Sequence, residues 1–157
     1  RKRIIILLVT ILLPMASMAE EEVIREQDGT ACTEADKFDT LMKSYSSQPG
    51  CTTINISNGM LETMDVAIGA DYMKVISVEN KELIPVFKEQ VEELIGMYEV
   101  IMSVNSGGES VDIYQQCSEN GSITDLFIST SNANSCVLIY IHGKDIVLSN
   151  IGNMINM

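Results

Sequence analysis

The sequence predicts an α+β domain in which helices pack on one face of a sheet that includes a four-stranded antiparallel meander. Two observations lead to this fold class. In the first half of the chain, segments whose apolar residues recur every three or four positions alternate with short segments rich in β-branched residues. After Gly96 the pattern changes to alternation, and four short segments of that kind follow one another. Helices followed by a run of strands are typical of α+β layers.

Turn residues define the meander. Its four strands are expected at residues 98–105, 111–117, 123–130 and 136–142. Gly107-Gly108 and Asn120-Gly121 predict hairpin turns because they accept positive φ angles, and two Asn between residues 131 and 135 also tolerate them. A glycine pair can also cradle a phosphate, but no helix begins after Gly108, so we interpret it as a turn.

The faces of two of these strands differ in pattern. In the first, Val100, Met102 and Val104 alternate with polar residues, which predicts a sheet with one wet face. In the last, residues 137–141 are apolar on both faces. This predicts a strand that is central in the sheet or covered by a helix.

The remaining elements surround the meander. Helices are expected between Thr33 and Pro49, from Asn58 to Ile68, from Asn80 to Ile95 and over residues 145–154, and strands at residues 51–57 and 73–79. Pro85 lies inside the third helix, where it would cost about 3 kcal/mol. We therefore expect its first turn to be distorted, or the regular helix to begin nearer Ile84.

The first 19 residues have the pattern of a cleavable export signal. Residues 1–3 are basic, residues 4–13 are apolar, and residues 17–19 are small-x-small, so cleavage is predicted after Ala19. Residues 20–32 are charged and are predicted to be a flexible leader, followed by a single α+β domain over residues 33–157. The mature chain is predicted to be soluble, without a transmembrane segment, in the periplasm or cell envelope.

The net charge of the chain limits the classes of molecule that it can bind. The full sequence has 22 acidic and 10 basic side chains, a net charge of −12. Because three of the basic residues belong to the predicted signal, the mature chain would carry −15. Such a charge opposes binding to nucleic acid or to anionic lipid, since both are polyanions.

Four cysteines, Cys32, Cys51, Cys117 and Cys136, permit disulfides in an exported chain. Pairing Cys32 with Cys51 and Cys117 with Cys136 is the most local of three connectivities, although a meander would set the second pair two strands apart. The alternative is that all four are small buried apolar residues. They contain no C-x-x-C spacing, and one histidine cannot complete a zinc set, so no metal site is predicted.

No catalytic or cofactor-binding residues are predicted either. His142 ends the last predicted strand, and the sequence shows neither a nucleophile nor an orienting acid for it, so we interpret it as a surface or strand-end residue. Glu109, Asp112 and Asp125 lie in or beside the meander. A carboxylate pair drawn from them would suit acid–base chemistry, but we interpret them as part of a solvated sheet face.

Three segments carry a family resemblance: FDTLMKSYSS, TTINISNGM and YEVIMSVNSGGESVDIY, in this order behind the predicted signal. With them, the chain from Phe38 onward resembles the Bacteroidetes domain-of-unknown-function family 4252, most specifically over residues 98–114. No catalytic residues are assigned to that family, so the resemblance implies none here. It implies an exported protein of a Bacteroidetes bacterium and connects it with envelope signalling.

Three functions are compatible with the sequence. The leading hypothesis is a non-enzymatic periplasmic or envelope domain that contacts an unknown envelope protein, for example by adding a partner strand to an edge of the meander. The second is a small-ligand carrier with a pocket between the sheet and the apolar face formed by Leu83, Phe87 and Val91. The third is a hydrolase that uses Asp112 or Asp125.

Overall fold

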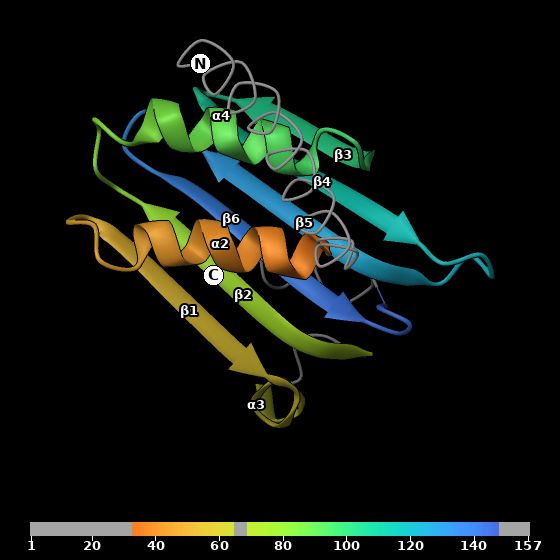
Figure 1. Ribbon diagram of the computed structural model, residues 1–157. Coiled ribbons are helices and arrows are strands. Elements are labelled where there is room, and N and C mark those ends of the chain that lie inside the picture. The colour runs from red at the N-terminus through yellow and green to blue at the C-terminus, as the bar shows by residue number, and fades with distance from the viewer. Residues whose placement is uncertain (1–32, 65–68, 148–157) are drawn as a thin grey trace, which may run out of the picture. The chain divides into compact units, whose positions relative to one another are not determined.

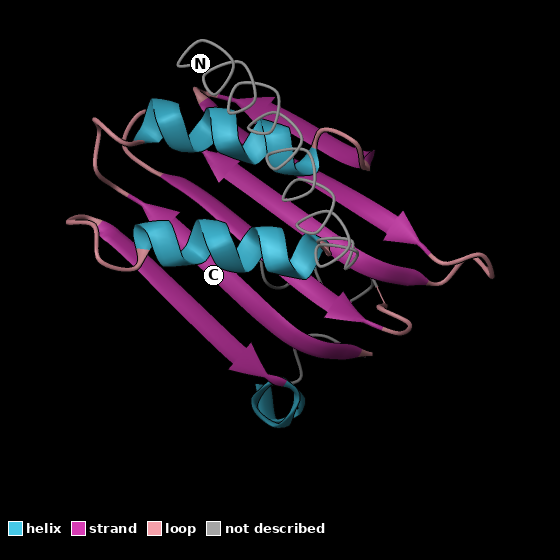
Figure 2. Ribbon diagram, in the orientation of Figure 1, coloured by secondary structure: helices cyan, strands magenta, loops and turns pink. Residues whose placement is uncertain are grey.

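The structure, a computed structural model, describes residues 33–64 and 69–147, and residues Glu34–Met157 form one compact unit. The described chain contains one antiparallel sheet of six strands in the order β1-β2-β6-β5-β4-β3 (Figures 1 and 2). The strands are β1 (Cys51–Ser57), β2 (Ala70–Val78), β3 (Glu99–Ser106), β4 (Glu109–Cys117), β5 (Ile123–Ser131) and β6 (Cys136–Gly143). The last four are neighbours in chain order, as a meander requires.

Strand β6 lies in the centre of the sheet, between β2 and β5. Its residues 137–141 were predicted to be central or covered because they are apolar on both faces. The burial of β6 agrees, since Leu138 and Ile141, which point to opposite faces, are both fully buried. Continuous apolar sequence therefore identified a central strand that is buried on both faces.

Within the described residues, three helices accompany the sheet: α2 (Glu34–Tyr45), α3 (Asn58–Met64) and α4 (Ile84–Ile95). Helices α2 and α4 lie side by side across one face, as Figure 1 shows. The prediction that all helices share this face was wrong for α3, because its Leu61 is buried among side chains of the opposite face. A helix as short as α3, with seven residues, can pack against either face of the sheet. Its sequence does not indicate which face.

The start of α4 shows how the chain accommodates Pro85. A turn precedes the helix, in which the amides of Leu83 and Ile84 donate to the carbonyl oxygen of Asn80, and the Asn80 side chain accepts from Glu82. The regular helix begins at Ile84, which puts Pro85 in the first turn. Its missing N–H costs little there, because first-turn amides have no intrahelical partner.

The core between the helices and the sheet is rich in aromatic side chains. Phe38 of α2, Phe87 of α4 and Phe127 of β5 are fully buried, and Tyr140 of β6 is 1% exposed. The rings of Phe127 and Tyr140 stack with centroids 4.6 Å apart. Burial of such a side chain stabilises a fold by about 1.5–3 kcal/mol, so this cluster is the main source of cohesion on the helix face.

A second apolar cluster lies on the opposite face of the sheet. Its buried members are Leu61, Ala70, Met73, Ile113, Leu126, Ile128, Ile141 and Ile146. Two buried faces explain why β6, with the sequence CVLIYIHG, has few polar residues. Among the described residues outside the sheet, Leu61 of α3 and Ile146 contribute to this second cluster.

The edge strand β3 departs from the predicted alternation. A bulge between Val100 and Met102 shifts its register, so Val100 faces Tyr114 while Met102 faces Ile113 on the other side of the sheet. All eight residues of the strand are exposed, so it has no buried face. The prediction that one face of this strand is buried is therefore wrong, because both faces of β3 are exposed to solvent.

Several predictions concern residues outside the described ranges. These are the signal peptide, the leader, Cys32 and most of the helix expected over residues 145–154. Residues 65–68, the end of the helix that was expected to follow Asn58, are also among them. Within the described ranges, no helix combines the length and the apolar content needed to cross a membrane.

Candidate functional site

The exposed edge formed by β3 is the candidate functional site. Among the described strands β3 pairs with β4 alone, so one side of its backbone has no strand beside it. Its apolar side chains are unusually accessible: Val100 is 52% exposed, Met102 38% and Val104 47%. Met102 and Val104 share a face with Ile113 and Val111 of β4, which belong to the second apolar cluster or pack against it. The core of that face thus continues to the edge of the sheet.

The other face of this edge carries Val100 near the beginning of β3 and is polar after the bulge. Ser103 donates a hydrogen bond of 2.5 Å to Asp112 on β4. Asp112 and Glu92 of α4 line a cavity of about 240 Å³ between that helix and the sheet. Burial, followed by the charges of Asp112 and Glu92, raises the pKa of Tyr114 in the same cavity. Two carboxylates and one ammonium group, that of Lys88, therefore line this cavity, which we call the acidic surface beside β3.

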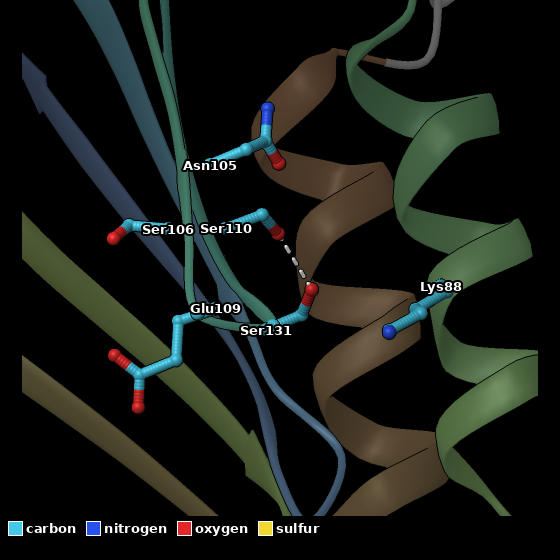
Figure 3. A pocket seen from close by; sticks show the side chains of 8 residues that line it. Lys88, Asn105, Ser106, Glu109, Ser110 and Ser131 are labelled. Carbon is cyan, nitrogen blue, oxygen red and sulfur yellow. Dashed lines mark hydrogen bonds between the residues drawn. The ribbon is translucent and has the colours of Figure 1, made fainter.

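A second hollow, of about 450 Å³, adjoins the turn between β3 and β4 (Figure 3). Gly107 and Gly108 make this turn with φ angles of 60° and 87°, which confirms the predicted hairpin. Lys88 of α4 lines the hollow, as do Ser110 and Ser131, whose hydroxyl groups are 2.7 Å apart. No helix N-terminus is among the lining residues, so the phosphate cradle that the glycine pair could have formed is not assembled here.

A polar cluster lies elsewhere on the helix face, around Asp125 of β5. Its Oδ1 atom is 2.6 Å from the hydroxyl group of Tyr140 and 2.9 Å from Nδ1 of His142, while Oδ2 accepts from Thr124 at 2.9 Å. Asp125 is 9% exposed. Burial, and then the hydrogen bond to Asp125, raises the pKa of Tyr140. The tyrosine therefore stays a neutral donor to the carboxylate.

The structure thus gives His142 the orienting acid that the sequence did not reveal. Tyr72 of β2 stacks on the imidazole with centroids 5.1 Å apart, and the side chain of His142 is 38% exposed. An oriented histidine with an accessible ring can act as a general base. No hydroxyl or thiol of the described residues hydrogen-bonds to its Nε2 atom, so the cluster has an oriented base without an assembled nucleophile.

A second charged group on this face is Lys74 of β2. Its Nζ atom is 2.6 Å from Asp39 of α2 and 4.7 Å from the centroid of the Tyr72 ring. The lysine is buried, and Asp39 is nearly half exposed. This pair connects helix to sheet and neutralises a charge that would otherwise be costly to bury.

The three acids singled out from the sequence do not come together. Asp125 faces Gln116, which is four residues along β4 from Asp112, or about 13 Å in a strand. Glu109 begins β4 at the hairpin turn. No carboxylate pair for acid–base catalysis is therefore formed from them.

Cys117 and Cys136 have free thiols in the structure. Cys117 is exposed at the end of β4, whereas Cys136 is buried at the beginning of β6, opposite Ser131. These two residues lie at opposite ends of the meander and are not joined. Burial raises the pKa of both Cys51 and Cys136. Pairing of Cys51 with Cys32 concerns a residue outside the described ranges and stays a prediction.

Comparison with known proteins places the fold in a family. A family model described as a domain of unknown function, DUF4252, matches residues 45–154, from the end of α2 beyond β6. The chain belongs to the DUF4252 family. The match includes the exposed edge β3, the acidic surface beside it and the Asp125 cluster. No curated protein and no solved structure matches the chain.

For this DUF4252 chain, sequence patterns located β3 but not its exposure. The exposure of β3 depends on two features that a local sequence pattern does not reveal. These are the order of the strands, which puts β3 at an edge, and the bulge beside Met102. The sequence did not indicate that Lys88 lines the hollow at the turn between β3 and β4, because this depends on how α4 packs on the sheet. No set of three or more His, Cys, Asp or Glu side chains within the described residues is arranged to hold a metal ion.

Proposed function

We propose that this domain is a non-enzymatic protein-binding module of the bacterial cell envelope, in which β3 accepts an extended segment of a partner protein. The observation that carries the proposal is the exposure of all eight residues of β3. An unpaired strand edge presents a row of N–H and C=O groups, and these are ready to pair with another chain. Exposed apolar side chains beside that row add contact area for the partner.

Proteins usually protect such edges. Lysine, proline or an inward-pointing charge on the edge strand prevents unwanted pairing. β3 has the sequence EVIMSVNS, so it contains no lysine or proline, and its one charge, Glu99, lies at its end. Its bulge is a protective device of another kind, but it lies near the beginning of the strand, and the five residues from Met102 to Ser106 pair without interruption after it. An edge of this kind is suited to binding.

The opposite edge, β1, provides a comparison. Its residues alternate between exposed and half-buried, because side chains such as Cys51 and Ile56 pack against the two apolar clusters. Only Ile54 among its large apolar side chains is strongly exposed, at 45%. The two edges are therefore unequal, and β3 is the more accessible one.

Export is part of the proposal, since residues 1–19 have the pattern of a signal peptide. The partner would then be an envelope protein, and the resemblance of the sequence connects such a role with envelope signalling. The negative charge of the chain supports a protein partner over nucleic acid or anionic lipid.

The two alternatives have less support. For a carrier, the face of α4 would need to line a ligand cavity, but Phe87 and Val91 are buried in close contact with the sheet. The 240 Å³ cavity beside Val91 is smaller than the roughly 300–1,000 Å³ of ligand pockets. For a hydrolase, Asp112 and Asp125 lie too far apart to act together.

The proposal can be tested by crosslinking in cells. A photoreactive amino acid at Met102 is expected to crosslink to one envelope protein, and the same group at Ile54 on the opposite edge is not. The substitution Val104→Lys should abolish the crosslink, because a lysine on an edge strand opposes strand addition. Equal products from both edges, or none from Met102, would contradict the proposal.

A further inference from the structure

We infer that the segment that binds β3 is a basic amphipathic strand, in which apolar residues alternate with lysine or arginine. This inference rests on the proposed function, because it takes strand addition at β3 as given and specifies the chemistry of the partner. It comes from the different character of the two faces that meet at the edge. A strand added to β3 would continue both faces, with alternate side chains on each.

One face requires apolar side chains in the partner. Met102 and Val104 lie there with Val111 and Ile113 of the neighbouring strand. Ile113 is 5% exposed, whereas Met102 is 38% and Val104 47% exposed. The apolar side chains of this face are therefore more exposed at the edge of the sheet. An additional strand with apolar side chains on this face would cover Met102 and Val104.

The other face requires positive charge. Asp112 lies one strand from the edge, and Glu92 overhangs the same cavity from α4. Lys88 is the one basic residue among those that line the two hollows near the edge. Lysine and arginine have long side chains that can pass over Ser103 to reach these carboxylates.

The ends of the edge are acidic as well. Glu99 begins β3, where Gln115 donates a hydrogen bond to it, and Glu109 lies opposite Ser106 at the hairpin. Gln115 and Glu109 occupy odd-numbered positions of β4, as Ile113 does, so the two glutamates flank the apolar face, where a lysine or arginine at either end of the partner segment can pair with them. The net charge of −12 would also steer such a segment towards the domain and raise its association rate.

The same charges oppose a second copy of the chain as the occupant. If two β3 strands paired antiparallel in the middle, Glu99 of one copy would approach the end of the other copy where Glu109 lies. Two strongly acidic chains would also repel each other at long range. The geometry therefore favours a basic partner over self-association.

Three nine-residue peptides test the inference. All have valine at alternate positions, and the positions between hold lysine, threonine or glutamate. Binding is measured by NMR titration of the domain at low salt, with protection of the β3 amides from hydrogen exchange as the sign of strand addition. We expect the lysine peptide to bind about tenfold more tightly than the threonine peptide, the glutamate peptide to bind most weakly, and the differences to shrink at high salt.

Variants locate the effect. The double substitution Glu92→Gln and Asp112→Asn should weaken the lysine peptide about fivefold and leave the threonine peptide within about twofold. Val104→Lys should weaken all three peptides. Its matched control is Ile54→Lys, a similar exposed residue on the opposite edge, which should change none of them.

The outcomes separate the inference from the proposed function. Equal binding of the lysine and threonine peptides, with β3 amides protected, would overturn the inferred charge and retain strand addition. Failure of every peptide to protect β3 would overturn both. A stable dimer of the free domain in sedimentation experiments, dissociated by Val104→Lys, would replace the basic partner with a second copy.

Discussion

The Nδ1 atom of His142 lies 2.9 Å from Oδ1 of Asp125, and the same oxygen accepts a hydrogen bond of 2.6 Å from the hydroxyl group of Tyr140. These residues are distant in sequence but face each other across β5 and β6, since Asp125 is the register partner of His142. Asp125 is a buried acid among aromatic rings. Its position suggests a structural role for a residue that would otherwise be assigned to catalysis.

Removal of the Asp125 carboxylate should destabilise the fold. We expect Asp125→Ala to lower the free energy of unfolding by about 2–4 kcal/mol, because the buried hydroxyl group of Tyr140 would lose its acceptor. Urea unfolding followed by circular dichroism measures this change. As a control, Asp112→Ala removes an acid whose partner Ser103 is exposed, and should cost less than about 1 kcal/mol. Equal costs for the two variants would refute a structural role for Asp125.

Stability should decrease in alkaline solution. Burial raises the pKa of Tyr98 and Tyr140 above the ordinary value of 10.0, so the unfolded chain loses these protons first. The unfolded state then binds fewer protons than the folded state, and the free energy of unfolding falls as the pH rises above about 10. The raised pKa of Cys136 adds a smaller loss that begins near its ordinary value of 9.0.

Urea unfolding at a series of pH values from 7 to 11 checks this expectation. The substitution Tyr140→Phe removes one of the titrating groups and should make the loss above pH 10 less steep. A free energy of unfolding that stays constant up to pH 11 would be incompatible with protonated buried tyrosines.

The ion pair between Lys74 and Asp39 should respond differently to the loss of each partner. Asp39→Ala leaves a buried ammonium group without its carboxylate, and we expect it to cost about 1–2 kcal/mol, a moderate value because Asp39 is 43% exposed. Lys74→Met keeps the apolar stem and removes the charge, so it should cost less. Thermal unfolding of both variants provides the comparison. A larger loss for Lys74→Met would show that the charge itself stabilises the domain.

Two close backbone approaches make Gly143 intolerant of a side chain. A Cβ atom there would lie 2.0 Å from the carbonyl oxygen of Gly69, at the irregular end of the β2–β6 pair. We expect Gly143→Ala to cost about 3 kcal/mol or more, because backbone atoms cannot yield as side chains do. The matched control is Gly59→Ala in α3, where a Cβ atom meets nothing within 4 Å. This control should be neutral or stabilise by up to about 1 kcal/mol, as differential scanning calorimetry would show.

The sequence was informative where structure depends on neighbouring residues. Turn glycines placed the hairpin at Gly107, continuous apolar sequence placed β6 in the centre, and Pro85 indicated where α4 becomes regular. Each of these features follows from the conformational limits of a few adjacent residues. The meander and the two long helices could therefore be predicted.

Features that depend on pairing between distant segments could not be predicted from the sequence. The approach of His142 to Asp125 requires the register of β5 against β6, and a shift of one residue would have turned the acid to the other face. The bulge beside Met102 interrupts the alternation without a sequence signal such as glycine. The sequence predicted that an edge of the meander could accept a partner strand, but the exposure of β3 on both faces follows from the order and register of the strands.

The position of β6 also has a consequence for how the molecule acquires its shape. Strands β1 and β2 pair with each other, and β3, β4 and β5 pair in sequence, but β6 alone connects these two groups. Until β6 is available the described chain holds two separate half-sheets, one on each side of the missing strand. Assembly must then close a loop of about 60 residues between β2 and β6, and such distant pairings slow folding. The domain should therefore gain its cooperativity in one late step.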